Sequence, residues 1–220
     1  GAVGPGTVQE GVFGLEPNAT PGRKFLDWLS VGGTALVIDV LPNRPDLLSH
    51  GGRGREIPAA TGRPMSRPWI SGGKPASVKL DTSDKVTGSV GKTVIQVNDT
   101  EGAPRYAAAV VCGVKIGPSP EWLARRIEDA GSRSINNVVD VTNYMLLGFG
   151  QPMHAFDLHQ SKGGKVVVRR AAASEKITTL DGKERTLNPG VTVIADAETP
   201  MAIAGVLGGR ESEVTEATTD

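Results

Sequence analysis

The sequence predicts an α+β fold: a mostly antiparallel sheet with two central helices, preceded by a small, partly irregular module. Three observations lead to this prediction. Valine, which favours strands, occurs 24 times among the 220 residues. Short β-type runs separated by turn residues fill the second half of the chain, and two segments between these runs have helical periodicity. Many short strands together with two helices in the middle of the chain are typical of the α+β class.

Composition excludes several classes of protein. The 24 basic and 24 acidic residues give a net charge of zero, which excludes a uniformly basic nucleic-acid coat. Cys112 is the only cysteine, so an intramolecular disulfide is impossible and a reducing, cytoplasmic location is expected. No apolar run approaches 18 residues, so no transmembrane helix or membrane partner is expected. The chain begins without Met, and we expect it to be excised from a longer protein.

The first part of the chain, residues 1–75, is predicted to hold the end of a small module and a Gly/Pro-rich linker. A short helix is expected at 24–29, and the apolar run 34–41 predicts a strand. A turn cluster follows, and then a short helix over 47–60 that contains three glycines. Because each glycine costs a helix about 1 kcal/mol relative to alanine, we expect this helix to be severely weakened. The three are Gly51, Gly52 and Gly54.

The first central helix has clear start and stop signals. Strands are expected before it at 94–97 and at 106–116, with Cys112 as an inert thiol inside the second of them. Ser119 is the expected N-cap residue, and Pro120 the first helical residue. Gly131 supplies the stop.

The second central helix and a β meander follow. Apolar residues between Val138 and Leu146 recur with helical spacing. Asp181-Gly182 is a strong hairpin signal between two of the later strands. The expected strands are 165–168, 176–180, 184–187, 191–195 and 201–207.

Few motifs indicate chemistry. The sequence has no Walker nucleotide loop and no nucleophile elbow, and its three histidines lack metal-ligand spacing, so no metal site is expected. What remains is a polar cluster of Asp140, Thr142 and Asn143 in the second helix, followed by the run QPMHAFD at 151–157. Buried polar groups need hydrogen-bond partners, so the cluster is either a polar network or a small-molecule pocket. Spacing alone leaves both interpretations open.

Six motifs in order resemble the β subunit of bacterial phenylalanyl-tRNA synthetase. The run INNVVDVTNY at 135–144 resembles a signature segment of that subunit, and QPMHAFD resembles its editing-domain loop. LPNRPD at 41–46 resembles another of its segments. The remaining three are GPSP at 117–120, LDGK at 180–183 and IAGVLGG at 203–209. The resemblance covers residues 34–220.

The resemblance implies that residues 76–220 are an editing domain that continues past Asp220 in the family. This domain hydrolyses tyrosine wrongly attached to phenylalanine tRNA. A second site is useful because an apolar pocket cannot strongly reject an isostere that only adds a hydroxyl. The implied parent is an α₂β₂ ligase that uses ATP and magnesium. Its aminoacylation chemistry resides in the α subunit, so this chain is expected to bind neither cofactor, and its partners are that subunit and the tRNA.

The resemblance also implies the site residues. His154 and Arg133 are the catalytic candidates: His154 orients water or bonds the terminal ribose, and Arg133 holds the tRNA terminus or the ester region. Gly208 lets the backbone approach the substrate closely, and Thr142 and Asn143 are assigned to substrate binding.

Two departures from the family pattern concern the backbone. The run Gly51-Gly52-Arg53-Gly54 stands where the family usually has apolar residues. Ser134 stands where the family usually has proline, which is expected to loosen the backbone beside Arg133. Two alternatives to editing are a non-catalytic RNA- or ligand-binding module of the same fold and a structural segment for tetramer assembly.

Overall fold

The computed structural model describes residues 20–24, 36–65 and 87–220. Residues 40–220 form one compact unit and residues 1–39 another. In the second of these, Arg23 N–H donates to the carbonyl of Thr20 at 3.4 Å and closes a turn. The helix predicted at 24–29 lies, apart from Lys24, outside the described residues.

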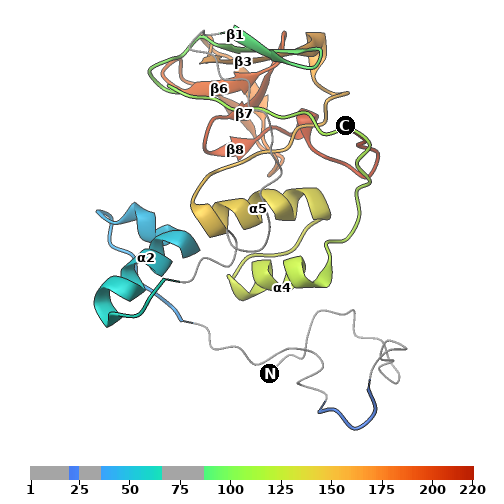
Figure 1. Ribbon diagram of the computed structural model, residues 1–220. Helices are drawn as coiled ribbons and strands as arrows, with labels where there is room; N and C mark the ends of the chain where they lie inside the picture. The colour runs from blue at the N-terminus through green and yellow to red at the C-terminus, as the bar shows by residue number, and fades with distance from the viewer. Residues whose placement is uncertain (1–19, 25–35, 66–86) are drawn as a thin grey trace. The chain divides into compact units, whose positions relative to one another are not determined.

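A six-stranded sheet dominates the larger unit, in the order β1-β2-β3-β6-β7-β8 (Figure 1). Its pairs are antiparallel except β2–β3, which confirms the predicted mostly antiparallel sheet. The strands are β1 Thr87–Val90, β2 Thr93–Val97, β3 Lys165–Arg170, β6 Thr192–Ala195, β7 Pro200–Ile203 and β8 Leu207–Gly208. The parallel pair needs a long crossover. Both central helices, α4 Glu121–Asp129 and α5 Asn137–Phe149, lie in that connection.

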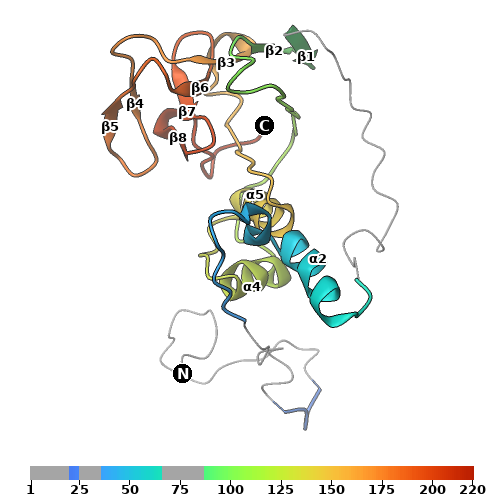
Figure 2. The same cartoon turned by 90° about the vertical axis from the view of Figure 1, so that its left-hand side faces the viewer.

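A second, two-stranded sheet packs beside the first. Its strands, β4 Lys176–Thr178 and β5 Glu184–Thr186, form the hairpin predicted around Asp181-Gly182. Figure 2 shows this hairpin next to β7 and β8, and a bridge between Thr179 and Gly209 joins them. The core between the sheets is aliphatic, as the scarcity of aromatic residues requires. It contains Ala171, Ile177, Leu187 and Val193, with Ile203 packed against them.

The helix α4 begins differently from the prediction. Leu123 and Ile127 form its buried face, and Gly131 ends it with a φ of 84°. However, the N-cap residue is Pro120 instead of Ser119, and no side chain caps the helix. The Ser119 hydroxyl donates to the Asp140 Oδ2 atom at 2.6 Å, a charge-assisted hydrogen bond to a buried carboxylate.

Two predicted strands are wrong. Of the run predicted at 34–41, residues 36–41 are described; they form no strand, and the side chain of Val37 is fully exposed. Residues 106–116 likewise form no strand, and within the described chain their backbone N–H groups make one backbone bond, from Val114 to Thr219 at 2.8 Å. A β-type run becomes a strand only when a neighbouring strand pairs with it.

Cys112 is consequently exposed rather than buried in a strand. The prediction of a thiol buried in a strand is therefore wrong. Hydrogen bonding to the Asp220 carboxylate is the main cause that raises the pKa of the Cys112 thiol. A raised pKa disfavours the nucleophilic thiolate, and the inertness of Cys112 stays a prediction.

The strand predicted over 201–207 is two strands. The chain reverses at Gly205, whose φ is 69°, between β7 and β8. This reversal places Gly208 opposite Ala202 in the register of the pair.

The helix expected to be weak, α2 His50–Thr61, forms despite its glycines. It follows a 3-10 turn, η1 Pro45–Leu48, and the Ser49 hydroxyl caps it by accepting from Gly52 N–H at 3.0 Å. A Cβ on Gly52 would lie 1.7 Å from the carbonyl oxygen of Asp46. The glycine is therefore needed for a close approach, and its propensity cost is overridden by packing.

Alanine substitutions at Gly52 and Gly54 separate the need for a close backbone approach from the cost of glycine in a helix. We expect Gly52→Ala to lower the free energy of unfolding by about 1–3 kcal/mol, because the new methyl group meets backbone. Gly54→Ala is the matched control, since the nearest atom to its Cβ is a flexible Met65 methyl 3.6 Å away. It should raise stability by about 1 kcal/mol. Urea unfolding measures both, and a stabilised Gly52→Ala variant would contradict the assignment.

Candidate functional site

Two of the predicted site residues, His154 and Gly208, are in direct contact. His154 lies on the loop after α5, and Gly208 lies in the edge strand β8. A Cβ built on Gly208 would lie 2.3 Å from the His154 Cε1 atom and 2.5 Å from its Nε2 atom. The imidazole therefore rests on the backbone of Gly208, and only glycine leaves room for it.

Apolar side chains surround this contact. The Phe156 ring meets the imidazole edge-on, with centroids 4.7 Å apart. The Leu180 Cδ1 atom lies 3.2 Å from the Gly208 Cβ position, and Leu180 N–H donates to the Gly208 carbonyl at 3.0 Å. One edge of the imidazole remains open to solvent, since His154 is an exposed residue. The arrangement presents a polar ring at the rim of an apolar surface.

The electrostatic setting keeps His154 neutral. Partial burial lowers the pKa of the imidazole below its usual range, and the Glu213 carboxylate opposes this shift. A neutral imidazole at pH 7 can accept a proton or a hydrogen bond from water. No pattern in the sequence indicated Glu213, because this residue lies far from His154 along the chain.

Arg133 lies on the loop between α4 and α5, and its side chain is exposed. It makes no hydrogen bond or ion pair with the residues that the structure describes, so its guanidinium is available there to a ligand. Next to it, where a loosened backbone was expected, the Ser134 hydroxyl donates to the Asp140 Oδ2 atom at 2.5 Å. The serine therefore ties this loop to α5 by a side-chain bond that a proline could not make.

The polar cluster of α5 divides into two parts. Asp140 is fully buried and belongs to a polar network, as one of the two interpretations proposed. The Thr142 hydroxyl donates to the Val139 carbonyl of its own helix at 2.7 Å. The half-buried Asn143 makes no side-chain hydrogen bond within the described chain. In that part of the chain, no hydrogen bond or ion pair joins Arg133, Thr142 or Asn143 to His154.

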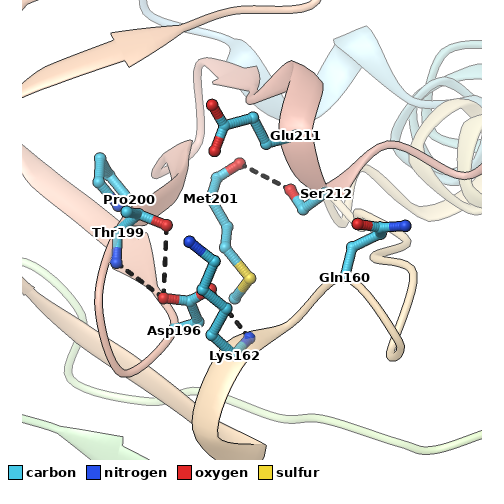
Figure 3. Close-up of a pocket in the computed structure, with 8 residues that line it drawn as sticks. All are labelled: Gln160, Lys162, Asp196, Thr199, Pro200, Met201, Glu211 and Ser212. Carbon is cyan, nitrogen blue, oxygen red and sulfur yellow. Dashed lines mark hydrogen bonds between the residues drawn. The ribbon is translucent and has the colours of Figure 1, made fainter.

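A separate pocket of about 280 Å³ lies near the 3-10 turn η3 Arg210–Ser212 (Figure 3). It is lined by Gln160, Lys162, Asp196, Thr199, Pro200, Met201, Glu211 and Ser212. The buried Asp196 carboxylate accepts from the backbone N–H groups of Lys162, Glu198 and Thr199 at 2.7–3.0 Å. These bonds lower the pKa of Asp196 although burial acts in the opposite direction. The carboxylate is thus a structural group, and none of the predicted site residues lines this pocket.

In the part of the chain that the structure describes, no group of three or more His, Cys, Asp or Glu side chains is arranged to hold a metal ion. None of the helices described is both long enough and apolar enough to cross a membrane.

The fold and the contact define an α+β domain with an imidazole seated on glycine backbone beside apolar side chains. The B3/4 domain matches residues 102–220, and the chain belongs to this domain family. It is also similar to proteins named phenylalanine–tRNA ligase β subunit. That of Moorella thermoacetica is 44% identical over 96% of this chain, and that of Anaeromyxobacter dehalogenans is 46% identical over 95%. That of Geobacter metallireducens is 43% identical over 99%.

This chain spans about a quarter of the length of those relatives, 25% of the first two and 26% of the third. The similarity over nearly the whole chain confirms the resemblance that the six motifs indicated.

Proposed function

We propose that this chain serves as the editing part of a phenylalanine–tRNA ligase β subunit and hydrolyses tyrosine from mischarged phenylalanine tRNA. The observation that carries the proposal is the His154 imidazole seated on Gly208 in a chain of the B3/4 domain family. Two residues far apart in sequence, both assigned to the site by resemblance, meet in space. The similarity to named ligase β subunits supports the parent activity.

The proposed reaction is hydrolysis of an ester. Water attacks the carbonyl carbon of the tyrosyl ester and loses a proton, and the ribose oxygen leaves with a proton. The products are tyrosine and free tRNA. His154, kept neutral by partial burial, orients the attacking water through a ring nitrogen. Gly208 leaves the space that the ring occupies.

The other predicted residues have supporting roles in this proposal. The exposed Arg133 guanidinium binds a phosphate of the tRNA terminus, for which its planar fork of donors is suited. Thr142 and Asn143 remain candidates for substrate binding. Asn143 has the stronger case, because its amide is uncommitted within the described chain whereas the Thr142 hydroxyl bonds its own helix.

The proposed setting is a cytoplasmic ligase in which an α subunit is the partner. In this proposal ATP and magnesium serve aminoacylation, whose chemistry the family resemblance assigns to the α subunit.

The test is deacylation of phenylalanine tRNA charged with tyrosine, compared with the same tRNA charged with phenylalanine. The intact protein should hydrolyse the tyrosyl ester selectively, and His154→Ala should reduce that rate by about a hundredfold. His50→Ala is the matched control, because His50 is exposed on α2 and, among the described residues, its ring bonds only the Leu147 carbonyl. Tight tRNA binding with no hydrolysis would instead favour a non-catalytic RNA-binding module.

The pH dependence of deacylation should report the environment of His154. Protonation removes the ring nitrogen that accepts from water, so the rate should fall only below the usual histidine pKa of about 6.5. Glu213→Gln removes a carboxylate that favours the imidazolium, so it should move this fall to still lower pH. Glu216→Gln, an exposed change in the same segment, should leave the profile unchanged. A rise of the midpoint in Glu213→Gln would contradict the assignment.

A further inference from the structure

The loop that carries His154 is fixed at its two ends. It starts at Gly150, the C-cap of α5, whose φ is 77° and whose N–H donates to the Leu146 carbonyl at 2.8 Å. It ends at Asp157. Within the described chain, residues 151–156 make no backbone-to-backbone hydrogen bond. The position of His154 therefore depends on how firmly the two ends are held.

Asp157 is held by bonds from several directions. Its side chain is 4% exposed, its Oδ1 atom accepts from His159 N–H at 2.9 Å, and its Oδ2 atom accepts from the Thr218 hydroxyl at 2.7 Å. Its own N–H donates to the Ser212 carbonyl at 3.1 Å. A buried carboxylate with this set of donors is fixed, because moving it would leave a charge and several polar groups without partners.

One backbone atom links this anchor to Gly208. The Met201 carbonyl in β7 accepts from the Ser212 hydroxyl at 3.2 Å and from Gly209 N–H at 2.7 Å. The segment that holds Asp157 and the strand that carries Gly208 therefore share an attachment point. Both sides of the His154–Gly208 contact are therefore tied to the Met201 carbonyl, one through Ser212 and Asp157 and the other through Gly209.

We propose that Asp157 is a positioning residue that holds the His154 imidazole against Gly208. The effect of Asp157 on catalysis rests on the proposed function, whereas its effect on the position of the imidazole does not. Phe156 lies between His154 and Asp157 in the sequence, and its ring meets the imidazole edge-on. Through this contact the position of Asp157 affects the position of the imidazole.

Two substitutions test the proposal from opposite sides of one hydrogen bond. Asp157→Asn keeps the shape and removes the charge. Thr218→Val keeps the shape and removes the hydroxyl that donates to Asp157, and Thr218→Ser is the conservative variant that restores it. Asp140→Asn is the matched control, because Asp140 is also buried and accepts three hydrogen bonds, but from the α4–α5 loops instead of the loop that carries His154.

The readout is carbethoxylation of each histidine with diethyl pyrocarbonate, followed by peptide mass spectrometry as a function of pH in the intact, folded protein. In Asp157→Asn and Thr218→Val, the midpoint for His154 should rise toward about 6.5 as the ring leaves its partly buried position. Thr218→Ser and Asp140→Asn should leave it at the wild-type value. His50, which is exposed in the folded protein, serves as the internal reference for reagent reactivity, and circular dichroism at each pH checks that the variants remain folded.

Deacylation provides a second, separable readout. Misplacement of His154 should slow hydrolysis of the tyrosyl ester by about tenfold to a hundredfold in Asp157→Asn. An unchanged His154 midpoint in both variants would overturn the positioning role. If His154→Ala hydrolyses the ester normally, the proposed function fails instead, while the carbethoxylation result still decides the role of Asp157.

Discussion

Gly208→Ala is expected to reduce deacylation of the tyrosyl ester by about a hundredfold while the protein remains folded. The new methyl carbon would lie 2.3 Å from the His154 ring, far inside van der Waals contact. The φ of Gly208 is not in the left-handed region, so alanine strains no backbone there. The imidazole is a mobile side chain and can turn away, which relieves the clash but moves the ring from its working position.

Two other glycines, one at the opposite edge of the sheet and one next to Gly208 in the chain, provide the controls for Gly208→Ala. Gly88→Ala in β1 meets nothing within 4 Å and should change neither activity nor stability by much. Gly209→Ala would place a methyl carbon 2.6 Å from the Met201 carbonyl oxygen, which is backbone and cannot turn away. It should therefore lower the melting temperature more than Gly208→Ala does. Full deacylation activity in Gly208→Ala would show that the contact has no part in hydrolysis.

Asp140→Ala is expected to have the largest effect on stability, about 3 kcal/mol, or a fall in melting temperature of about 6–12 °C. The Asp140 carboxylate is fully buried and accepts from the hydroxyls of Ser119 and Ser134 and from Ile135 N–H at 2.5–2.9 Å. Alanine would leave these three donors without a partner and would open a cavity beside α5. The loop that carries Arg133 would lose its attachment to the helix.

Differential scanning calorimetry measures this effect. Val141→Ala is the control on the same helix, because Val141 is 49% exposed and its truncation should change stability by less than about 0.5 kcal/mol. Asp140→Asn should lie between the two, since its amide oxygen still accepts one bond and the serine hydroxyls can rotate to accept from its amide. Equal stability of Asp140→Ala and Val141→Ala would refute the role of the buried carboxylate.

The sequence predicted part of the candidate site and missed the remainder. The family resemblance brought His154 and Gly208 to attention, and the structure places them in contact. Neither spacing nor resemblance indicated Glu213, and Asp157 appeared only as the last residue of the QPMHAFD motif, with no role assigned to it. Both act through residues distant in the chain, Glu213 through its charge and Asp157 through Thr218 and Ser212.

Local signals in the sequence determined several elements by themselves. The apolar face of α4, its stop at Gly131 and the Asp181-Gly182 hairpin all act within a few residues, so a pattern can specify them. Tertiary structure decided the rest. Residues 106–116 have strand composition but lack a pairing partner in the described chain, and α2 keeps glycines because Gly52 approaches a carbonyl closely. The pairing of strands, the close approach of Gly52 to a carbonyl and the desolvation of His154 share one physical cause. Each depends on groups that only folding brings together, so a linear pattern does not contain the distances between them.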